Sequence, residues 1–486
     1  MLIIHDIKVW DTGERIDLVV PDIDSRRLLS ESDSVVSGEI DGSSMILAPG
    51  FADPHVHFRD PGQLDKETMV TGAQAAAAGG YTRVLIMPNT LPAMDGCDAD
   101  MNDKDGVRNA LEYVQNYERL HDVKLPVRYD VSVCASVGRA GRQPTRSRDY
   151  ARFMDSAARS GQGGDSVLTK SGVVCSANVE HPLRAISDDG SAITDGILGA
   201  VFQEAKTTGL PILEHCEHHD SGCINEGMVS RKLDVEGISA QTELAVVERD
   251  IEAVRQTGVR VHFQHVSTAA AFDAIRQAKS EALPITCETA PHYLALCDED
   301  VLEYGTMAKM NPPLRSDADR KATVAAVVDG TIDMVATDHA PHTRIEKQTG
   351  LADAPNGIIG LECAYGICRK MLVESGSIGD ERLIELMAVA PERLMGHAAT
   401  DIATLLNTSS TCATKRTLDL SQVEHPENVD LVVIDTENEW VVDSSQFHSK
   451  GRNTPFDGWK LTGRPVVTII GAKLVFSRLS STSGTE

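Results

Sequence analysis

The sequence contains no uninterrupted apolar run of about 18 residues, the minimum that a membrane-spanning helix requires. Its first six residues lack the basic start and apolar core of a secretory signal, so we expect a cytoplasmic protein. The ten cysteines include no Cys-x-x-Cys pair, which argues against a structural zinc site and favours free thiols in a reducing compartment.

Basic residues are scarce. The 72 Asp and Glu residues outnumber the 46 Lys and Arg residues, and the formal net charge is -26 over 486 residues. An acidic surface of this kind argues against nucleic acid and anionic membranes as partners. It would also repel an anionic substrate, which would therefore need positive groups inside its pocket.

Within residues 49–396, apolar runs rich in Val and Ile alternate with longer stretches of helical spacing. Eight runs that we interpret as strands end near His57, Met87, Ala135, Asp188, His215, His265, Glu288 and Asp338. Between Ser239 and Gln256, apolar residues recur at steps of four and three, and Gly258 follows as a stop signal. Alternating strands and helices predict a parallel sheet, and eight such units predict an α/β fold closed into a (β/α)8 TIM-like barrel.

The two ends of the chain carry short alternating strands instead, for example Asp430–Asp435 and Val466–Ile470. Residues 1–48 and 397–486 together therefore predict a small β-sandwich domain beside the barrel. It would be formed from both chain ends.

Two further stretches are interpreted as insertions. Residues 139–177 hold many Arg residues, and residues 398–428 are rich in Thr and Ser. We expect solvated loops in both places, and a contact with a partner is the alternative for the arginine-rich stretch.

Candidate metal ligands stand where the predicted strands end. His55 and His57 are two positions apart in an extended strand, so their side chains project from the same face. Four more candidates stand at the ends of later strands: Asp188, His215, His265 and Asp338. Active sites of such barrels are built from the carboxyl ends of the strands, so the sequence predicts that all six side chains converge there.

Imidazole and carboxylate groups suit Zn²⁺ and similar ions. Four His and two Asp exceed what one tetrahedral ion needs, so we expect two ions about 3.5–4 Å apart that share a carboxylate and a hydroxide. Coordination lowers the pKa of water from roughly 15.7 to about 7. A neighbouring carboxylate can take a proton from that water and deliver it to a leaving nitrogen, which is hydrolytic chemistry at an amide-like carbon.

With these residues the chain resembles the amidohydrolase superfamily, and within it the larger, bacterial type of dihydroorotase, over essentially its full length. The strings that carry the resemblance are PGFADPHVHFR at 49–59, MPNT at 87–90, SDDG at 187–190, EHCE at 214–217, NPPLR at 311–315, ATDHAPH at 336–342 and NTPF at 453–456. The pair His-x-His and the string Thr-Asp-His occur widely in the superfamily. The Asp-Asp-Gly string together with His-x-Arg and Pro-Asn-Thr is more specific.

The resemblance implies reversible, zinc-dependent cyclisation of N-carbamoyl-L-aspartate to (S)-dihydroorotate in pyrimidine (UMP) biosynthesis. It implies that His55, His57 and Asp338 hold one zinc ion, that His215 and His265 hold the other, and that Asp188 bridges them. Asp338 would also act catalytically as the proton shuttle. The implied substrate-binding residues are Arg59, Asn89, Asn311, His342 and the backbone around Asn356 and Gly357. A homo-oligomer, and association with aspartate transcarbamoylase, are further expectations.

Three alternatives stay open. The long stretch before the fourth strand leaves Asp189 as an alternative to Asp188 for the bridging position. A hydantoinase or allantoinase would bridge its metals with a carboxylated lysine, for which Lys170 is the candidate. A catalytically inactive partner of a transcarbamoylase is the third alternative.

Overall fold

The computed structural model describes residues 1–21, 38–101, 106–154, 166–168, 174–176, 179–217, 221–408 and 416–479. Within these residues, no helix combines the length and the apolar character that crossing a bilayer demands. Eight cysteines are free thiols: Cys97, Cys134, Cys216, Cys223, Cys287, Cys297, Cys363 and Cys368.

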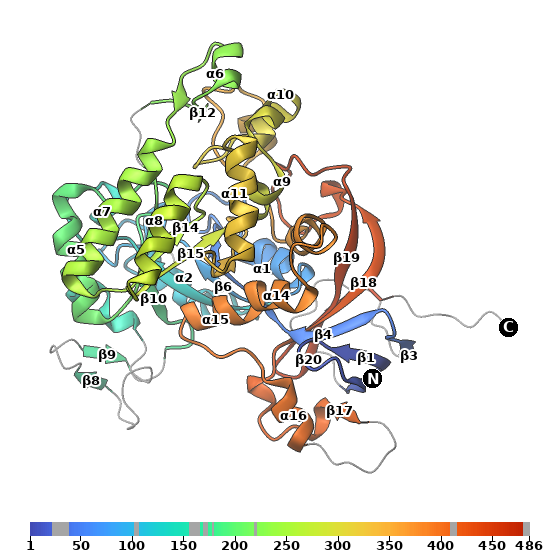
Figure 1. Cartoon of the computed structure of the whole chain (residues 1–486). Helices are drawn as coiled ribbons and strands as arrows, with labels where there is room; N and C mark the ends of the chain where they lie inside the picture. Colours follow the sequence, from blue (N-terminus) through green and yellow to red (C-terminus); the bar gives the residue numbers. More distant parts are fainter. Residues whose placement is uncertain are drawn as a thin grey trace.

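Eight parallel strands form the barrel sheet in the order β16-β15-β14-β11-β10-β7-β6-β5. They are β5 Phe51–Val56, β6 Tyr81–Ile86, β7 Arg128–Val133, β10 Leu183–Ile186, β11 Ile212–His215, β14 Val261–Gln264, β15 Ile285–Thr289 and β16 Met334–Val335. A bridge between Val56 and His339 joins β5 to the segment after β16 and closes the ring. All eight strands predicted from the sequence are present, and the TIM-like barrel is confirmed (Figure 1).

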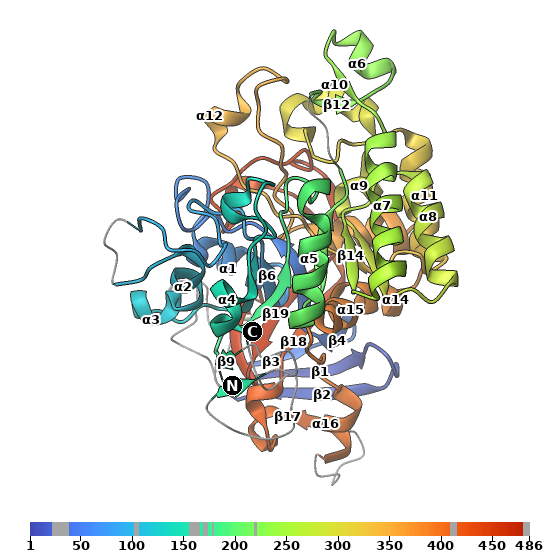
Figure 2. The same ribbon diagram turned by 90° about the vertical axis from the view of Figure 1, so that its left-hand side faces the viewer.

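Helices connect the strands, and the longer ones cover the outside of the barrel. They are α1 Met69–Ala78, α2 Ala110–Gln115, α3 Tyr117–His121, α4 Ser147–Tyr150, α5 Asp195–Thr208, α6 Met228–Lys232, α7 Gln241–Thr257, α8 Ala269–Ser280, α9 Pro291–Ala295, α10 Val301–Tyr304, α11 Asp317–Val328, α12 Arg344–Lys347, α13 Ala364–Cys368, α14 Asp380–Ile384 and α15 Ala390–Leu394. Figures 1 and 2 show α5, α7, α8 and α11 along one flank. The predicted stop at Gly258 is observed, since this residue ends α7 in a left-handed conformation with φ of 70°.

The barrel has an outer and an inner apolar layer. The outer layer lies between strands and helices and includes Val131, Ile186 and Val261. The inner layer is a small cluster of Ala52, Leu85, Met87, Ala185, Leu213 and Met395. Apolar side chains fill this part of the barrel interior, and the polar side chains at the carboxyl ends of the strands are left to form a site.

A second eight-stranded sheet is built from both chain ends, as predicted. Its order is β17-β2-β1-β4-β18-β19-β20, and β3 pairs with β1. The strands are β1 Leu2–Val9, β2 Arg15–Val20, β3 Gly38–Asp41, β4 Met45–Pro49, β17 Thr417–Asp419, β18 Leu431–Val441, β19 Lys460–Ile470 and β20 Lys473–Ser477. Antiparallel pairing of β4 with β18 joins the two ends of the chain, and β4 leads directly into β5 of the barrel. The domain limits given by the sequence stay predictions.

The two predicted insertions contain more regular structure than solvated loops would. Residues 139–177 include α4 and the short antiparallel strands β8 Ser166–Leu168 and β9 Val174–Ser176. Residues 398–428 include α16 Ile402–Thr408 and β17, which pairs with β2. A separate excursion between β11 and α7 carries α6 and the strands β12 Ile224–Asn225 and β13 Gly237–Ile238, and it projects from the rest of the molecule (Figure 1).

Candidate active site and metal centre

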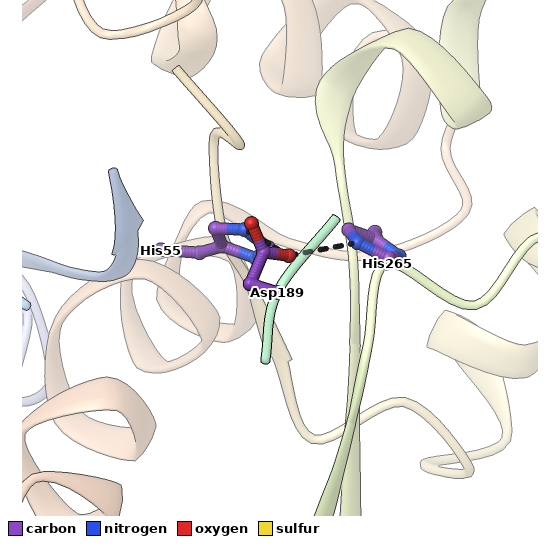
Figure 3. A group of neighbouring side chains, drawn as sticks. All are labelled: His55, Asp189 and His265. Carbon is purple, nitrogen blue, oxygen red and sulfur yellow. Dashed lines mark ion pairs between the residues drawn. The ribbon is translucent and has the colours of Figure 1, made fainter. Parts of the chain in front are cut away.

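Two overlapping groups of buried His and Asp side chains lie at the carboxyl ends of the barrel strands. In the first group, His55 Nε2 lies 3.2 Å and His265 Nε2 lies 3.7 Å from Asp189 Oδ1 (Figure 3). In the second group, the Nε2 atoms of His55 and His57 lie 3.5 and 3.1 Å from Asp338 Oδ1. His55 belongs to both groups, so they form one continuous cluster.

His215 completes the cluster from the end of β11. Its Nδ1 lies 3.5 Å from Asp189 Oδ1 and 3.0 Å from His265 Nε2. Asp189 Oδ2 also lies 3.4 Å from His57 Nε2, so this one carboxylate contacts four imidazoles. The structure therefore brings together the predicted ligands His55, His57, His215, His265 and Asp338.

The structure places Asp189 in the cluster in the position predicted for Asp188, which corrects the prediction. The Asp188 carboxylate accepts hydrogen bonds from the Ser136 backbone N–H (3.0 Å) and hydroxyl (2.5 Å). The reason is the alternation of side chains along an extended chain. Ser187 donates a hydrogen bond to Gln264 (3.3 Å) inside the barrel, so Asp189, two positions on, shares its face and Asp188 does not.

The cluster has the properties of a site for metal cations. His55 Nε2 and His265 Nδ1 are buried and have no hydrogen-bond partner among the described residues, although buried polar atoms are nearly always paired. His55 Nδ1 contacts Glu288 (2.9 Å) and His57 Nδ1 contacts Oδ1 of the Asn89 side chain (2.8 Å). Outer contacts of this kind orient imidazole ligands. The donor set of four imidazoles and two carboxylates therefore fits zinc-type ions.

In this cluster, burial and neighbouring charges shift the pKa values of His55 and Asp338 in opposite directions. Burial lowers the pKa of His55, but the carboxylates of Asp189 and Asp338 raise it well above its usual value. Burial raises the pKa of Asp338, but His55, His57 and His265 bring it below its usual value. The two ionised carboxylates favour positive charge between them, and bound cations would supply it.

A pocket of about 250 Å³ opens onto the cluster. Its lining includes all the predicted substrate-binding residues: Arg59, Asn89, Asn311, His342, Asn356 and Gly357. The Arg59 guanidinium contacts the Pro341 carbonyl (3.4 Å) and His342 (3.4 Å), and it forms no ion pair with a carboxylate of the described residues. Burial lowers the pKa of Arg59 to about 10, which leaves it charged at neutral pH.

The two predicted asparagines touch metal-facing side chains as well as the pocket. Asn89 donates from Nδ2 to Asp189 Oδ2 (3.1 Å), and Asn311 Nδ2 lies 3.1 Å from His215 Nε2. Asn311 Oδ1 is buried and has no hydrogen-bond partner among the residues described. The two amide side chains therefore help to fix Asp189 and His215, and Asn311 Oδ1 is available to accept a hydrogen bond.

Asn453, from the segment between β18 and β19, forms hydrogen bonds to the backbone of residues that line the pocket. Its Oδ1 accepts a hydrogen bond from the His342 backbone N–H (3.0 Å). Its Nδ2 donates to the backbone carbonyls of Ala340 (2.9 Å) and Gly357 (3.0 Å). One amide side chain thus fixes two loops that line the pocket.

Several residues around the pocket have left-handed backbone conformations, which side chains other than glycine rarely adopt. They are Arg59 (φ 58°), Arg139 (φ 54°), His265 (φ 34°) and Asp338 (φ 48°). Such conformations cost energy and gather at functional sites, where the surrounding structure imposes them.

Comparison with known proteins agrees with this geometry. The model of the Amidohydrolase family matches residues 46–475 of the chain.

The chain belongs to the amidohydrolase family.

Curated dihydroorotases are among the similar sequences. Those of Anaeromyxobacter dehalogenans (strain 2CP-1) and Lactiplantibacillus plantarum are each 37% identical to this chain and cover 90% and 89% of it, with 87% of each relative matched. A solved L-hydantoinase (dihydropyrimidinase) from Arthrobacter aurescens has a TM-score of 0.69 at 22% identity, and the match covers 99% of this chain and 97% of that one. This likeness shows the shared fold.

These findings confirm the predicted resemblance and indicate a cyclic amide hydrolase. Amidohydrolases are typically metal-dependent, in agreement with the His and Asp cluster. Sequence reasoning missed two residues of this amidohydrolase site. Glu288 was recognised only as a strand end, and Arg139, which lines the pocket, was assigned to an insertion. The signal for Glu288 was its position on a barrel strand, whereas a lone arginine in a loop gives no signal of its own.

Proposed function

We propose that the protein is a dihydroorotase, which interconverts N-carbamoyl-L-aspartate and (S)-dihydroorotate in pyrimidine biosynthesis. The observation that carries the proposal is the position of Arg59. This guanidinium has no carboxylate partner among the described residues and lines a pocket that ends at a cluster of four His and two Asp. A cyclic amide that carries a carboxylate satisfies both features, since guanidinium groups bind carboxylates through two parallel hydrogen bonds.

We expect two zinc ions in the cluster. His55, His57 and Asp338 would hold one ion, His215 and His265 would hold the other, and Asp189 would bridge them, because its two oxygens face imidazoles of both sets. When bound, the ions would supply Lewis acidity toward the ring carbonyl and the attacking water.

The protein's own residues then bind the substrate and move protons. In ring opening, Arg59 holds the carboxylate, and the backbone at Asn356 and Gly357 faces the ring. Asp338 accepts a proton from the attacking water and delivers it to the ring nitrogen as the C–N bond breaks. Ring closure runs through the same steps in reverse, with one water released for each C–N bond formed.

His342 helps to keep the carboxylate site intact. Burial lowers the pKa of His342 to about 2, with further lowering from Arg59, so the ring is neutral at physiological pH. A neutral ring does not repel the Arg59 guanidinium beside it. Its Nε2 lies 2.8 Å from the Asn356 carbonyl oxygen, which ties the ring to the backbone that faces the substrate.

Hydrolysis of uncharged cyclic amides, as in a hydantoinase, is the second candidate, supported by the fold match to solved hydantoinases. Its lysine candidate, Lys170, lies outside the described residues. Asp189 already contacts four imidazoles, so the cluster has a carboxylate in the bridging position without a modified lysine.

One assay tests the proposal. The purified full-length protein, loaded with zinc, is offered dihydroorotate, hydantoin and allantoin side by side. We expect kcat/KM for dihydroorotate to exceed the other two values at least about a hundredfold, since charge-assisted hydrogen bonds of this kind contribute about 1.5–3 kcal/mol each. Faster turnover of hydantoin or allantoin would overturn the proposal. The cytoplasmic location, the homo-oligomer and a transcarbamoylase partner stay predictions.

A further inference from the structure

Arg139 is a second guanidinium that reaches the pocket, from the loop after β7. It lines the pocket together with Asn89 and Gly190. Its Nη2 lies 2.9 Å from the point where a Cβ on Gly190 would be, so the absence of a side chain at position 190 makes room for it. Gly190 directly follows Asp189, which places Arg139 on the metal-facing side of the pocket.

The Arg139 side chain has no hydrogen-bond or ion-pair partner within the part of the chain that the structure describes. Its Nε is buried and unpaired, which is uncommon because a buried donor without a partner destabilises the fold. The residue also adopts a left-handed backbone conformation, with φ of 54°. A half-buried guanidinium that lines a pocket and has no partner there is suited to an anionic ligand.

The loop that carries Arg139 is anchored by buried carboxylates. Asp188 accepts hydrogen bonds from the backbone N–H and the hydroxyl of Ser136, at 3.0 and 2.5 Å. Asp95 accepts one from the Gly138 N–H (2.7 Å), and the Ser136 hydroxyl oxygen accepts one from the Gly141 N–H (2.9 Å). The left-handed backbone of Arg139 is therefore held from both sides, and Asp188 acts as a positioning residue for it.

The two guanidiniums enter the pocket from different parts of the rim. Arg59 follows β5 and contacts Pro341 and His342, in the segment after β16. Arg139 follows β7 and meets Gly190, in the segment after β10. In the barrel order β6 lies between β5 and β7, so the two side chains approach a ligand from different directions.

On the basis of the proposed function, we propose that Arg139 binds the carboxylate of N-carbamoyl-L-aspartate that reacts in ring closure. N-carbamoyl-L-aspartate has two carboxylates, whereas dihydroorotate has one. In ring closure the ureido nitrogen loses a proton and bonds to the carbon of the second carboxylate, and a C–O bond of that carboxylate breaks. The oxygen leaves as water, with the proton from the nitrogen and one proton taken up from solvent. Arg59 then binds the carboxylate present in both compounds, and Arg139, beside Gly190, binds the one that only the open-chain diacid has.

If the two arginines bind different carboxylates, a substitution of Arg139 should weaken the binding of N-carbamoyl-L-aspartate more than that of dihydroorotate. In Arg139→Gln, the inhibition constant of N-carbamoyl-L-aspartate, measured as a product inhibitor of ring opening, should rise at least about tenfold, as expected for a lost hydrogen bond between charged groups. The KM for dihydroorotate should change less than about threefold. The equilibrium constant ties kcat/KM in the two directions together, so KM and kcat for ring closure should rise in parallel.

Two variants complete the experiment. Arg142→Gln removes the same charge from an exposed position three residues further along, and it should behave as the wild type. Arg139→Lys keeps the charge without the planar fork and should raise the inhibition constant about threefold. Thermal unfolding of each variant shows whether the fold is intact, and Arg139→Lys carries the test if Arg139→Gln does not fold.

An equal rise of the inhibition constant and of KM for dihydroorotate would overturn the assignment of Arg139, as would no change in either constant. A wild-type protein that opens dihydroorotate would still support the proposed function in both cases. A wild-type protein inactive on dihydroorotate would overturn the proposed function and the role of Arg139 with it.

Discussion

Asp188 and Asp189 are adjacent in the chain, but their carboxylates have separate partners. Asp189 Oδ1 lies 3.2 Å from His55 Nε2, whereas Asp188 Oδ2 lies 2.5 Å from the Ser136 hydroxyl oxygen. One carboxylate therefore belongs to the His and Asp cluster, and the other belongs to a loop at its edge. The same substitution at the two positions should have different consequences.

Asp189→Asn should lose bound zinc and lower turnover at least about a hundredfold, because an amide is a poor substitute for a carboxylate between imidazoles. Asp188→Asn should keep most of its metal, since its carboxylate contacts Ser136 and not the imidazoles. Metal content by elemental analysis, together with turnover, tests the pair. Loss of metal in Asp188→Asn alone would show that the assignment of the two residues is reversed.

Asp338→Asn should slow both directions of the reaction strongly while the fold remains intact and the four imidazoles and Asp189 retain most of the metal. General acid–base groups contribute about a hundredfold to ten-thousandfold to rate, so we expect a fall in kcat within that range. The equilibrium constant requires equal losses of kcat/KM in both directions. Near-normal turnover in this variant would remove Asp338 from the role of proton shuttle.

Arg59→Ala should mainly weaken binding of the anionic substrate. The side chain forms no ion pair with a carboxylate of the described residues, so its removal breaks no ion pair there. We expect KM for dihydroorotate to rise about tenfold or more, and hydrolysis of an uncharged ring such as dihydrouracil to fall much less. Equal losses on charged and uncharged rings would argue for a structural role.

The Glu288→Gln substitution leaves every predicted metal ligand in place, but it should still weaken metal binding. Glu288 Oε1 contacts His55 Nδ1 at 2.9 Å, and its Oε2 contacts His262 Nε2 at 2.9 Å inside the barrel. Loss of such an outer contact typically costs about tenfold to a hundredfold in metal affinity. Competition with a chelator measures the change, and an unchanged affinity would contradict this role.

Glu118 should make the fold sensitive to acid. Burial raises the pKa of Glu118, but His181, whose Nε2 lies 3.6 Å away, and hydrogen bonds from Lys124 and the Leu125 N–H outweigh it and lower the pKa from 4.5 to about 2. A lowered folded-state pKa stabilises the fold above about pH 4.5, and this stability is lost as the pH falls toward 2. The shift corresponds to at most about 3 kcal/mol in the free energy of unfolding.

Urea unfolding at several pH values tests this expectation. In Glu118→Gln, the free energy of unfolding should be lower at neutral pH and should fall less between pH 4.5 and 2 than in the wild type. Parallel curves for the two proteins would show that Glu118 does not carry this part of the acid sensitivity.

The barrel could be predicted from the sequence because each of its strands leaves a local signal. Runs of Val and Ile mark the buried strands, and five of the six predicted ligands fall at strand ends that the structure brings together. Asp189 could also have been found. Ala185 lies in the inner apolar layer, so alternation along the chain places Ser187 and Asp189 on the same face.

Arg139 could not be found in the same way. Its position depends on a left-handed turn, on the absence of a side chain at Gly190 and on hydrogen bonds from Ser136 to Asp188. These features depend on contacts between loops whose residues are 52 positions apart, and no periodic pattern in the sequence encodes them. The regular structure in the insertions escaped prediction for a related reason, since β17 is stabilised by pairing with β2 at the other end of the chain.

The hydrogen bonds of Asn453 affect the order in which the barrel and the pocket form during synthesis. Asn453 follows every barrel strand in the sequence, yet it fixes the backbone at Ala340, His342 and Gly357. On the ribosome, a nascent chain could complete its ring of strands before this amide had been synthesised. Closure of the ring and formation of a competent pocket would then be separate events, and the second would require synthesis of the segment between β18 and β19.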